Sequence, residues 1–353
     1  MKVLYLYTEV MSYTVATIKE LLKKNIEVHL VHWDEKKNTP YKIPPIDGLN
    51  EYKRSLFSEK ELLNLSDTIN PNLLVISGWQ DNVYLTVARH QRRKNKIVVC
   101  AFDDQWHGTV RQYFAFLLGK FRFFSRYFSH AWVSGVYQFE YARKLGFKKN
   151  EIIYDLYSAD LSIFKKSYKK TNFITNSRSC KFLYIGRFHS SKGLDVLISA
   201  WKKVYKKKLN WNLHLIGNGE LKNKLINLKG VYVYDFMQPK SLLKEIAKTQ
   251  CFILPSRKEP WGVVVHEMVA AGLPLILSNK VGSAKTFLIH NYNGFIFESE
   301  NSESLASYMK KIMNMSYQNL KSMRNASLSL SRRITPCTSS RNLISLLETS
   351  QKS

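Results

Sequence analysis

Short apolar segments alternate with segments of helical periodicity along most of this chain. In the first half, the apolar segments are residues 3–7, 26–33, 73–77, 97–101 and 130–134. These segments are apolar on both faces, so helices must cover both sides of the sheet that they form, which is typical of parallel strands. The alternation therefore predicts an α/β fold with doubly wound parallel sheets.

The alternation is interrupted between residues 155 and 180, where Lys, Ser, Asn and Tyr predominate, and it then resumes. A chain of 353 residues is long enough for two domains. We predict two Rossmann-like domains that face each other across a deep cleft. Doubly wound sheets bind ligands at the carboxyl ends of their strands, so we expect the ligand in that cleft. The expected order is an N-terminal domain (residues 1–160), a linker (161–180), a C-terminal domain (181–330) and a helical tail (331–353). The tail could cross back to the N-terminal domain.

The second half carries its expected elements in a regular series. The predicted strands are residues 182–185, 211–216, 231–234, 251–254, 275–277 and 295–297. The predicted helices are residues 194–204, 242–247, 263–271 and 304–313, and a closing helix is expected at 342–347.

The charge of the chain points to an anionic partner. Lys and Arg number 54 against 27 Asp and Glu, for a net charge of +27. Nucleic acid, a membrane surface and phosphorylated substrates all remain open on this ground. The lysine runs are scattered over both halves instead of along one binding face, which disfavours nucleic acid.

The four cysteines lie far apart and form no C-x-x-C pair, so neither a disulfide framework nor a zinc site is expected, and a cytoplasmic location is consistent. The apolar run at the N-terminus is too short for a signal peptide and is interpreted as a buried strand. No segment approaches the roughly 20 apolar residues of a membrane span.

Two acidic residues bracket the start of a predicted helix within residues 255–297. Glu259 precedes the helix and Glu267 lies on its second turn, with Pro260 and Gly262 between them. A carboxylate can accept two hydrogen bonds from a vicinal diol, and a helix start offers N–H groups to phosphate. The alternative is simple capping, because acids are favoured near a helix start.

Two cations follow the first strand of the second half. The strand ends at Gly186, Arg187 comes next, and Lys192 precedes a helix. Arg offers a planar fork to phosphate oxygens and Lys a point charge, although solvated surface cations are the alternative. Gly217 ends the following strand in a sharp turn where backbone can approach a ligand. That turn lacks the third glycine of a dinucleotide fingerprint.

Taken together, these blocks resemble the family 4 glycosyltransferases, which are retaining enzymes of GT-B fold. The matching blocks are IGRFHSSKGLDVLISAW, LHLIGNGELKNKL, ILPSRKEPWGVVVHEMVAAGLPLI and NYNGFIF, in the family's order over roughly residues 180–298. The first half matches only in its general α/β layout and in LYSADLSIF at residues 156–164, where the family often has Asn-Gly before the Asp.

The resemblance implies a donor site for a nucleotide sugar. Arg187 and Lys192 would bind the donor diphosphate without a metal or other cofactor, Glu267 would hold the ribose hydroxyls, and Glu259 would face the donor sugar. The backbone near the sugar and phosphates would come from Gly186, Gly217, Trp261, Gly262, Val263 and Val264. No enzymic nucleophile is required, and the residues expected to be catalytic are Glu259, Arg187, Lys192 and His107.

The acceptor side rests on fewer residues. Asp103, Asp104 and His107 follow a first-half strand and could contact the donor sugar or the acceptor, although a loop histidine is commonly a solvated one. Residues 8–12 replace a loop that is often glycine-rich in relatives, and they contain no glycine. Lys285 stands in a region where many relatives carry Glu.

Residues 110–128 are aromatic and basic and contain no acid. Such a segment suits docking to an anionic membrane leaflet through its rings and through cations such as Arg122 and Arg126. The alternative is a core helix of the first domain with its cations outward.

The predicted function is that of a metal-independent, retaining hexosyltransferase. It would move a sugar from a nucleotide-sugar donor to a saccharide or lipid-linked acceptor in surface polysaccharide synthesis (capsule, O-antigen or lipopolysaccharide). The expected location is cytoplasmic, with peripheral contact to the inner face of the plasma membrane as an open question. The alternatives are a nucleotide-sugar epimerase or a phosphorylase of the same fold, a basic nucleic-acid-binding protein, and an inactive homologue.

Overall fold

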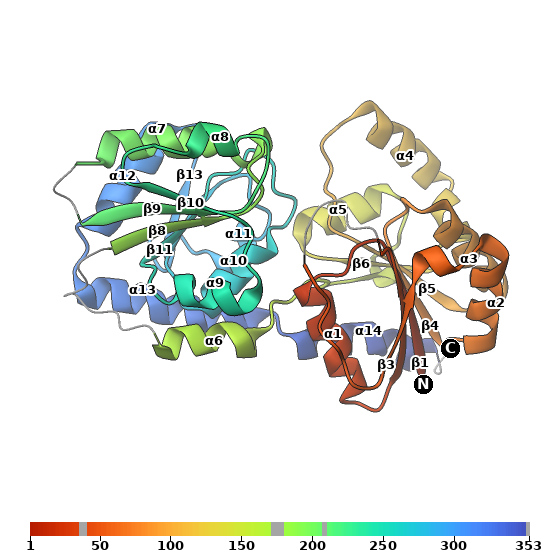
Figure 1. Ribbon diagram of the computed structural model, residues 1–353. Helices are drawn as coiled ribbons and strands as arrows, with labels where there is room; N and C mark the ends of the chain where they lie inside the picture. Colours follow the sequence, from red (N-terminus) through yellow and green to blue (C-terminus); the bar gives the residue numbers. More distant parts are fainter. Residues whose placement is uncertain (35–40, 171–179, 207–209, 351–353) are drawn as a thin grey trace. The chain divides into compact units, whose positions relative to one another are not determined.

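The chain divides into two compact units in a computed structural model, which describes residues 1–34, 41–170, 180–206 and 210–350. The N-terminal unit comprises Met1–Ser158 together with Pro336–Ser353, and the C-terminal unit comprises Ala159–Thr335 (Figure 1). Each unit is built around a parallel sheet with helices on both faces, which confirms the predicted α/β class.

The sheet of the N-terminal unit has the strand order β3-β2-β1-β4-β5-β6-β7. Its strands are β1 (Lys2–Tyr7), β2 (Glu27–His32), β3 (Leu49–Lys53), β4 (Leu73–Ser77), β5 (Ile97–Phe102), β6 (His130–Val133) and β7 (Ile152–Ile153). The helices are α1 (Ser12–Leu22), α2 (Glu59–Ile69), α3 (Asn82–Arg93), α4 (Val110–Lys120), α5 (Val136–Lys144) and α14 (Pro336–Ser350).

Successive residues of β1 enter two different cores, which is why the strand is apolar on both faces. Val3 and Tyr5 pack in one core with residues of α1 and α14. Leu4 and Leu6 pack in the other core with residues of α2, α3 and α5. The side chains of a strand alternate between its faces, so a sheet covered on both sides demands apolar residues at consecutive positions.

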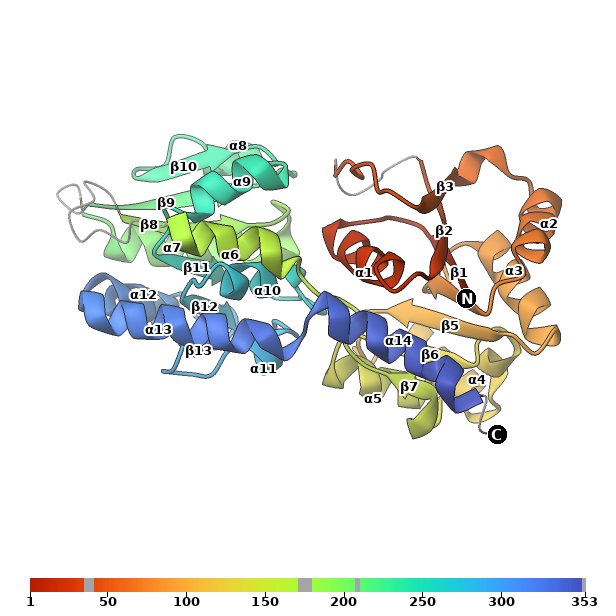
Figure 2. The ribbon, with the colours of Figure 1, turned by 90° about the horizontal axis from the view of Figure 1, so that it is seen from below.

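The sheet of the C-terminal unit has the order β10-β9-β8-β11-β12-β13. Its strands are β8 (Cys180–Ile185), β9 (Trp211–Ile216), β10 (Val231–Tyr234), β11 (Cys251–Leu254), β12 (Leu275–Ser278) and β13 (Gly294–Phe297). Figures 1 and 2 show α7 and α12 together on one face and α6, α9, α10 and α13 on the other. The helices are α6 (Leu161–Lys170), α7 (Leu194–Val204), α8 (Lys222–Leu225), α9 (Pro239–Ile246), α10 (Val263–Ala270), α11 (Ala284–Phe287), α12 (Ser302–Met313) and α13 (Tyr317–Leu330).

The segment interpreted as a linker differs from the prediction. Residues 161–170 form α6, which packs on α9 and α10 within the C-terminal unit, while residues 171–179 lie outside the described residues. A short amphipathic helix flanked by lysines has few apolar positions, so its composition resembles that of a loop. The tail forms α14, which packs on α1 in the N-terminal unit.

Several further elements were absent from the prediction, among them the short elements β7, α8 and α11. The strand β3 is polar and largely exposed at the edge of its sheet, so it lacks the apolar run by which the other strands were recognised. The helix α13 was also missed. Among the described residues, no helix has both the length and the apolar character needed to cross a membrane.

Candidate functional site

The strand order of the C-terminal unit reverses direction between β8 and β11, which lie side by side in the sheet although they are distant in sequence. Ligands of doubly wound sheets bind outside the carboxyl ends of the strands at such a reversal. The residues that follow β8 include Arg187 and Lys192, and those that follow β11 include Glu259. The topology therefore brings these sequence-predicted residues to one edge of one sheet.

Backbone contacts join the two loops at this edge. The N–H groups of Arg257 and Lys258 donate to the carbonyl of Ser191 over 2.8 and 3.2 Å. Gly193 has φ +66°, and a Cβ there would lie 2.2 Å from the carbonyl oxygen of Pro255. Glycine is thus required where the loop after β8 meets the loop after β11.

Lys192 and Glu259 contact each other directly. The Nζ of Lys192 lies 2.6 Å from the Oε2 of Glu259, and both side chains are 13% exposed. The hydroxyl of Ser256 donates to the same carboxylate oxygen over 3.3 Å. Gly262 has φ +86°, and a Cβ there would come within 2.9 Å of the Cγ of Glu259. A larger residue at Gly262 would force the Glu259 side chain or the loop to shift.

A third loop, which follows β12, supports the backbone around Glu259. The N–H of Gly282 donates to the carbonyl of Glu259, and the N–H of Ser283 donates to the carbonyl of Trp261, each over 2.9 Å. The Ser283 hydroxyl donates to the carbonyl of Gly262 over 3.1 Å. These bonds hold the loop at the point where α10 begins.

The helix α10 begins at Val263 and carries Glu267 on its second turn, as the sequence predicted. Val263, Val264 and Glu267 are all partly exposed. The first N–H groups of a helix have no partner within the helix, and its dipole is positive at this end. The start of α10 can therefore receive an anion next to the Lys192–Glu259 pair. Lys285 is exposed on the neighbouring α11.

Trp261 contributes its backbone to this loop, whereas its side chain belongs to the core. The residue is 2% exposed, and its ring packs edge-on against Phe287 at 6.2 Å between centroids. The Nε1 of Trp261 is buried without a hydrogen-bond partner among the described residues. A ligand would therefore meet the Trp261 peptide group before it met the indole.

The ends of β8 and β9 are in close contact. A Cβ on Gly217 would lie 1.9 Å from the carbonyl oxygen of Gly186, so glycine is needed there for steric reasons alone. The Tyr184 hydroxyl donates to the carbonyl of Arg187 over 2.8 Å. Burial raises the pKa of that hydroxyl, the charge of Glu259 raises it further, and the charge of Arg187 lowers it. The Arg187 side chain is exposed at this edge.

Sequence reasoning missed an arginine that links three segments. Arg257 makes a bidentate pair with Asp195 at 2.7 and 2.6 Å, approaches Glu300 at 2.9 Å, and donates to the carbonyl of Ser190. The Asp195 hydrogen bonds are the main cause that raises the pKa of Arg257, and in return they lower the pKa of Asp195. The partners are far apart in sequence, so no local pattern signals this contact.

A buried histidine on α10 was also missed. The Nδ1 of His266 accepts from the N–H of Ala159 over 3.0 Å, and its Nε2–H donates to the carbonyl of Ser331 over 2.9 Å. Its ring stacks on Phe287 at 4.2 Å. Burial lowers the pKa of His266 to about 4, so the imidazole is neutral at pH 7. It bonds segments close to both ends of the C-terminal unit, Ala159–Thr335.

His107 lies in the N-terminal unit, apart in the chain from the Lys192–Glu259 pair. Its side chain is exposed, and its N–H donates to the side-chain oxygen of Gln112 over 2.7 Å. The carbonyl of Asp103 accepts from Gln138 over 2.9 Å, and Asp104 is exposed. The roles predicted for His107, Asp103 and Asp104 stay predictions.

The strand order of the N-terminal unit reverses between β1 and β4, one strand away from the loop that carries His107. At that reversal the N–H of Thr8 donates to the Ser77 hydroxyl over 2.9 Å. The four cysteines are free. Within residues 1–34, 41–170, 180–206 and 210–350, no cluster of three His, Cys, Asp or Glu side chains could hold a metal ion.

Comparison with known proteins gives this site a family context. Residues 166–328 match the family model of glycosyl transferases group 1. An uncharacterized glycosyltransferase of Haemophilus influenzae is 31% identical over 137 residues, which is 37% of this chain and 39% of that protein. The capsular polysaccharide biosynthesis glycosyltransferase CapM of Staphylococcus aureus is 26% identical over 182 residues, 48% of this chain and 45% of that protein. This chain thus spans less than half the length of each.

A solved structure resembles the chain over nearly its full length. Anabaena HepE in complex with UDP and glucose has a TM-score of 0.72 at 14% identity, covering 99% of this chain and 100% of HepE. This likeness identifies the fold as GT-B, as the sequence predicted.

Proposed function

We propose that this chain, whose residues 166–328 belong to the glycosyl transferases group 1 family, transfers a sugar from a nucleotide-sugar donor to an acceptor. The observation that carries the proposal is the Lys192–Glu259 pair at the strand-order reversal, beside the start of α10. A helix start that can receive an anion, a cation and a carboxylate are what a nucleoside diphosphate-sugar needs at one site: positive charge and N–H groups for its phosphates, and acceptors for its hydroxyls.

The proposed roles follow from the chemistry of the leaving group. Departure of a nucleoside diphosphate adds negative charge to the leaving phosphate, and preorganised cations lower the barrier to its departure. We assign this role to Arg187 and Lys192, without a metal or another cofactor. Glu267 would bind the ribose hydroxyls and Glu259 the donor sugar, with transfer that retains the anomeric configuration.

The direct contact of Lys192 with Glu259 adds a detail to these roles. Each side chain neutralises the other at 2.6 Å, so neither leaves an uncompensated charge in a largely buried site. A donor that brings its own phosphates and hydroxyls would compete for both groups. Binding of the donor would then exchange this internal pair for contacts with the ligand.

The acceptor is proposed to be a saccharide or a lipid-linked saccharide of a surface polysaccharide. The support is the similarity to CapM, which is a capsular polysaccharide biosynthesis glycosyltransferase. HepE, a GT-B protein with UDP and glucose bound, supports a uridine nucleotide as the first donor to test.

The first experiment is thermal unfolding with nucleoside diphosphates and nucleotide sugars. A ligand at about 100 times its Kd stabilises the folded state by about 2.7 kcal/mol. We expect at least one nucleotide to raise Tm in the wild type, and Glu267→Ala to remove most of that shift. Glu303→Ala is the matched control, because it removes an exposed acid from α12 in the same unit.

Two results would contradict the proposal. The site assignment is wrong if no nucleotide stabilises the wild type, or if Glu267→Ala retains the whole shift. A new sugar product formed from a nucleotide sugar with no acceptor present would instead establish an epimerase.

A further inference from the structure

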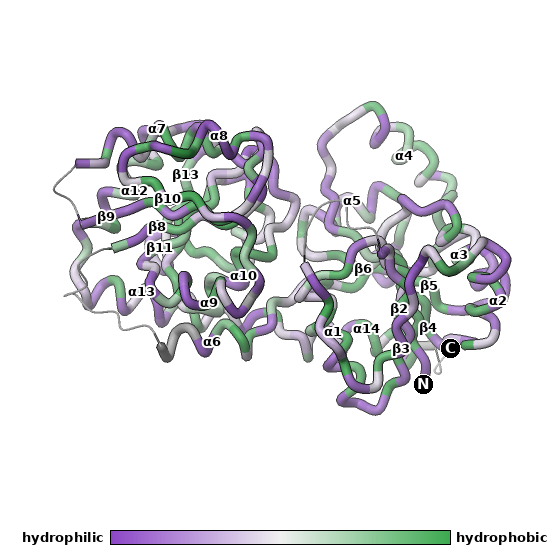
Figure 3. The backbone as a smooth tube through the Cα atoms, viewed as in Figure 1, coloured by the Kyte–Doolittle hydropathy of each residue, from purple (hydrophilic) through white to green (hydrophobic). Residues whose placement is uncertain are grey.

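The helix α4 of the N-terminal unit exposes large apolar side chains along one face. At about 3.6 residues per turn, positions separated by three, four, seven and eleven residues fall on one stripe. The stripe consists of residues whose exposed fractions are 88%, 54%, 64%, 53% and 85%, namely Val110, Tyr113, Phe114, Leu117 and Phe121. Figure 3 shows hydrophobic residues along this helix.

The fully buried positions of α4 are a glutamine and a glycine, while Phe116, which lies 6.3 Å from the Trp106 ring, is only partly buried. A Cβ on Gly119 would lie 2.6 Å from the carbonyl oxygen of Lys144, so the helix packs on the end of α5 through its bare backbone. Gln112 is 6% exposed and donates to the carbonyl of Gln105. A surface helix of a globular protein normally buries its main apolar stripe, whereas most of the large apolar side chains of α4 are exposed. The core-helix alternative therefore does not describe the exposed stripe of α4, although Phe128 at the end of the same segment is buried in the core.

Cations border the apolar stripe on both sides. At the same helical period, Arg111 lies on one side of the stripe and Lys120 on the other, and both are exposed. No acidic residue occurs between Asp104 and Glu140. The exposed side of α4 is thus apolar along its centre and cationic at its borders, and the helix itself carries no acidic residue.

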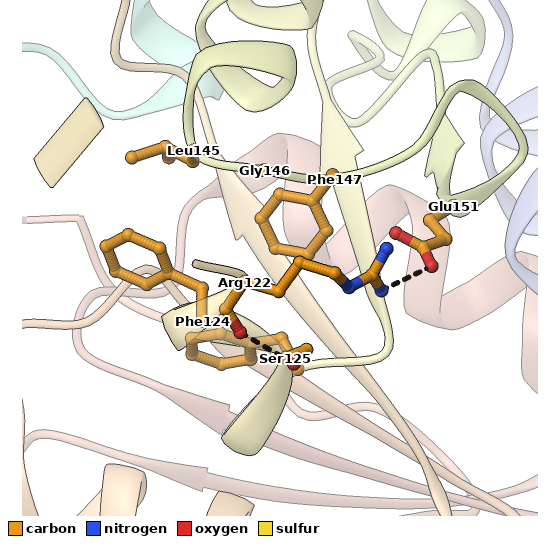
Figure 4. A pocket seen from close by; sticks show the side chains of 8 residues that line it. Arg122, Phe124, Ser125, Leu145, Gly146, Phe147 and Glu151 are labelled. Atoms are coloured by element: carbon orange, nitrogen blue, oxygen red, sulfur yellow. Dashed lines mark hydrogen bonds and ion pairs between the residues drawn. The ribbon is translucent and has the colours of Figure 1, made fainter. Parts of the chain in front are cut away.

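The cations expected to meet a membrane need one revision. Arg122 pairs with Glu151 at 2.7 Å and lines a cavity of about 10 Å³, with room for roughly one water molecule (Figure 4). Its role is therefore to hold the turn after α4. Arg126 is exposed and lies 5.4 Å from the ring of Phe123.

We propose that the α4 surface, defined as the apolar stripe with Arg111 and Lys120, docks onto an anionic lipid bilayer. The aromatic and aliphatic side chains would enter the interfacial region while the cations meet lipid phosphates. A second copy of this chain is disfavoured as the occupant, because it would bring like charges together on a protein of net charge +27.

The test is co-sedimentation of the full chain with vesicles. We expect binding to phosphatidylcholine vesicles that contain phosphatidylglycerol at about 30 mol% in about 0.1 M NaCl, and at least about tenfold weaker binding in about 0.5 M NaCl, where the Debye length is shorter. The variant Phe114→Ser/Leu117→Ser should bind at least about tenfold more weakly. Leu56→Ser is the matched control, since Leu56 is 68% exposed in the same unit, and it should bind like the wild type.

A charge variant separates the electrostatic contribution to vesicle binding from the apolar contribution. Arg111→Glu/Lys120→Glu should lose at least about tenfold in binding to the anionic vesicles, because each nearby cation contributes about 1 kcal/mol. The proposal is overturned if the wild type does not bind these vesicles, or if either double variant binds as well as the wild type. It is also overturned if Phe114→Ser/Leu117→Ser converts a wild-type dimer to a monomer without affecting vesicle binding.

Controls keep these outcomes interpretable. Circular dichroism and Tm of each variant are compared with the wild type, because α4 already exposes these side chains and their replacement removes no core contact. The nucleotide-induced Tm shift is measured on the same preparations. A variant that loses vesicle binding but keeps the nucleotide-induced Tm shift has a defect in the α4 surface alone. A variant that keeps vesicle binding but loses the Tm shift has a defect in the donor site alone.

Discussion

Acid should destabilise the C-terminal unit through His266. The neutral imidazole accepts from the Ala159 N–H at Nδ1 and donates from Nε2 to the Ser331 carbonyl. Protonation would add a hydrogen to Nδ1, which would then face the Ala159 N–H, another donor. Neither of the two hydrogen-bond partners of the ring is a carboxylate that could balance the new charge in this buried site. The charged form is therefore disfavoured in the folded state.

The size of this effect follows from the pKa of His266, which burial lowers from 6.5 to about 4. Between pH 6.5 and pH 4, His266 is protonated in the unfolded chain but neutral in the folded one. The contribution of the neutral imidazole to folding stability is therefore complete above pH 6.5 and is lost as the pH falls toward 4. One pKa unit corresponds to about 1.4 kcal/mol, so roughly 2 kcal/mol should be lost between pH 7.5 and pH 5.

The assay compares urea unfolding of the wild type and of His266→Gln at these two pH values. The variant cannot titrate at this position, so its loss of stability should be smaller than that of the wild type by about 2 kcal/mol. Burial also lowers the pKa of His214 to about 4, and only the difference between the two proteins isolates His266. His290→Gln, an exposed control in the same unit, should behave as the wild type.

Hydrogen exchange locates the change. The amide of Ala159, which donates to His266, should exchange faster at pH 5 relative to its intrinsic rate in the wild type. Equal losses of stability in the wild type and in His266→Gln would refute the reasoning, because the titrating group would then lie elsewhere.

Two further substitutions test how the site is held. Gly282→Ala places a Cβ 1.9 Å from the carbonyl oxygen of Pro260, so we expect a loss of about 1–3 kcal/mol and of the nucleotide-induced Tm shift. Gly78→Ala is the control for backbone strain, because φ is +67° there but no atom lies within 4 Å of the new Cβ; it should lose some stability and keep the nucleotide-induced Tm shift. Retention of the shift in both variants would contradict the prediction. Arg257→Ala removes the bidentate contact with Asp195, and we expect urea unfolding to show a loss of about 1 kcal/mol that shrinks in high salt. A salt-independent loss in Arg257→Ala would contradict an electrostatic role.

Much of the fold was predictable because local pattern and sheet environment agree. The predicted bounds of β4, β9, β10, β11 and α7 coincide with those in the structure. The strands β4 and β11 are compact apolar runs that are almost wholly buried, as strands covered on both faces are. The edge strand β3 escaped prediction because its sequence is mostly polar and most of its side chains are exposed.

The candidate site was predictable in its members but not in its contacts. Glu259, Glu267, Arg187 and Lys192 stand out by residue type next to strand ends and a helix start, and the family blocks reinforced that choice. The Lys192–Glu259 contact itself joins residues 67 positions apart. Nothing in the sequence pattern predicted that these two side chains would face each other.

By itself, the sequence determined the α/β class, the series of strands and helices, and the residue types available at the carboxyl ends of the strands. These properties depend on periodicity and turn chemistry within short windows. The tertiary structure alone decided that β11 lies beside β8, that His266 bonds both Ala159 and Ser331, and that α4 turns its apolar stripe outward. Such features depend on strand order and on which helix faces find a partner, and both are set by packing between segments distant in sequence.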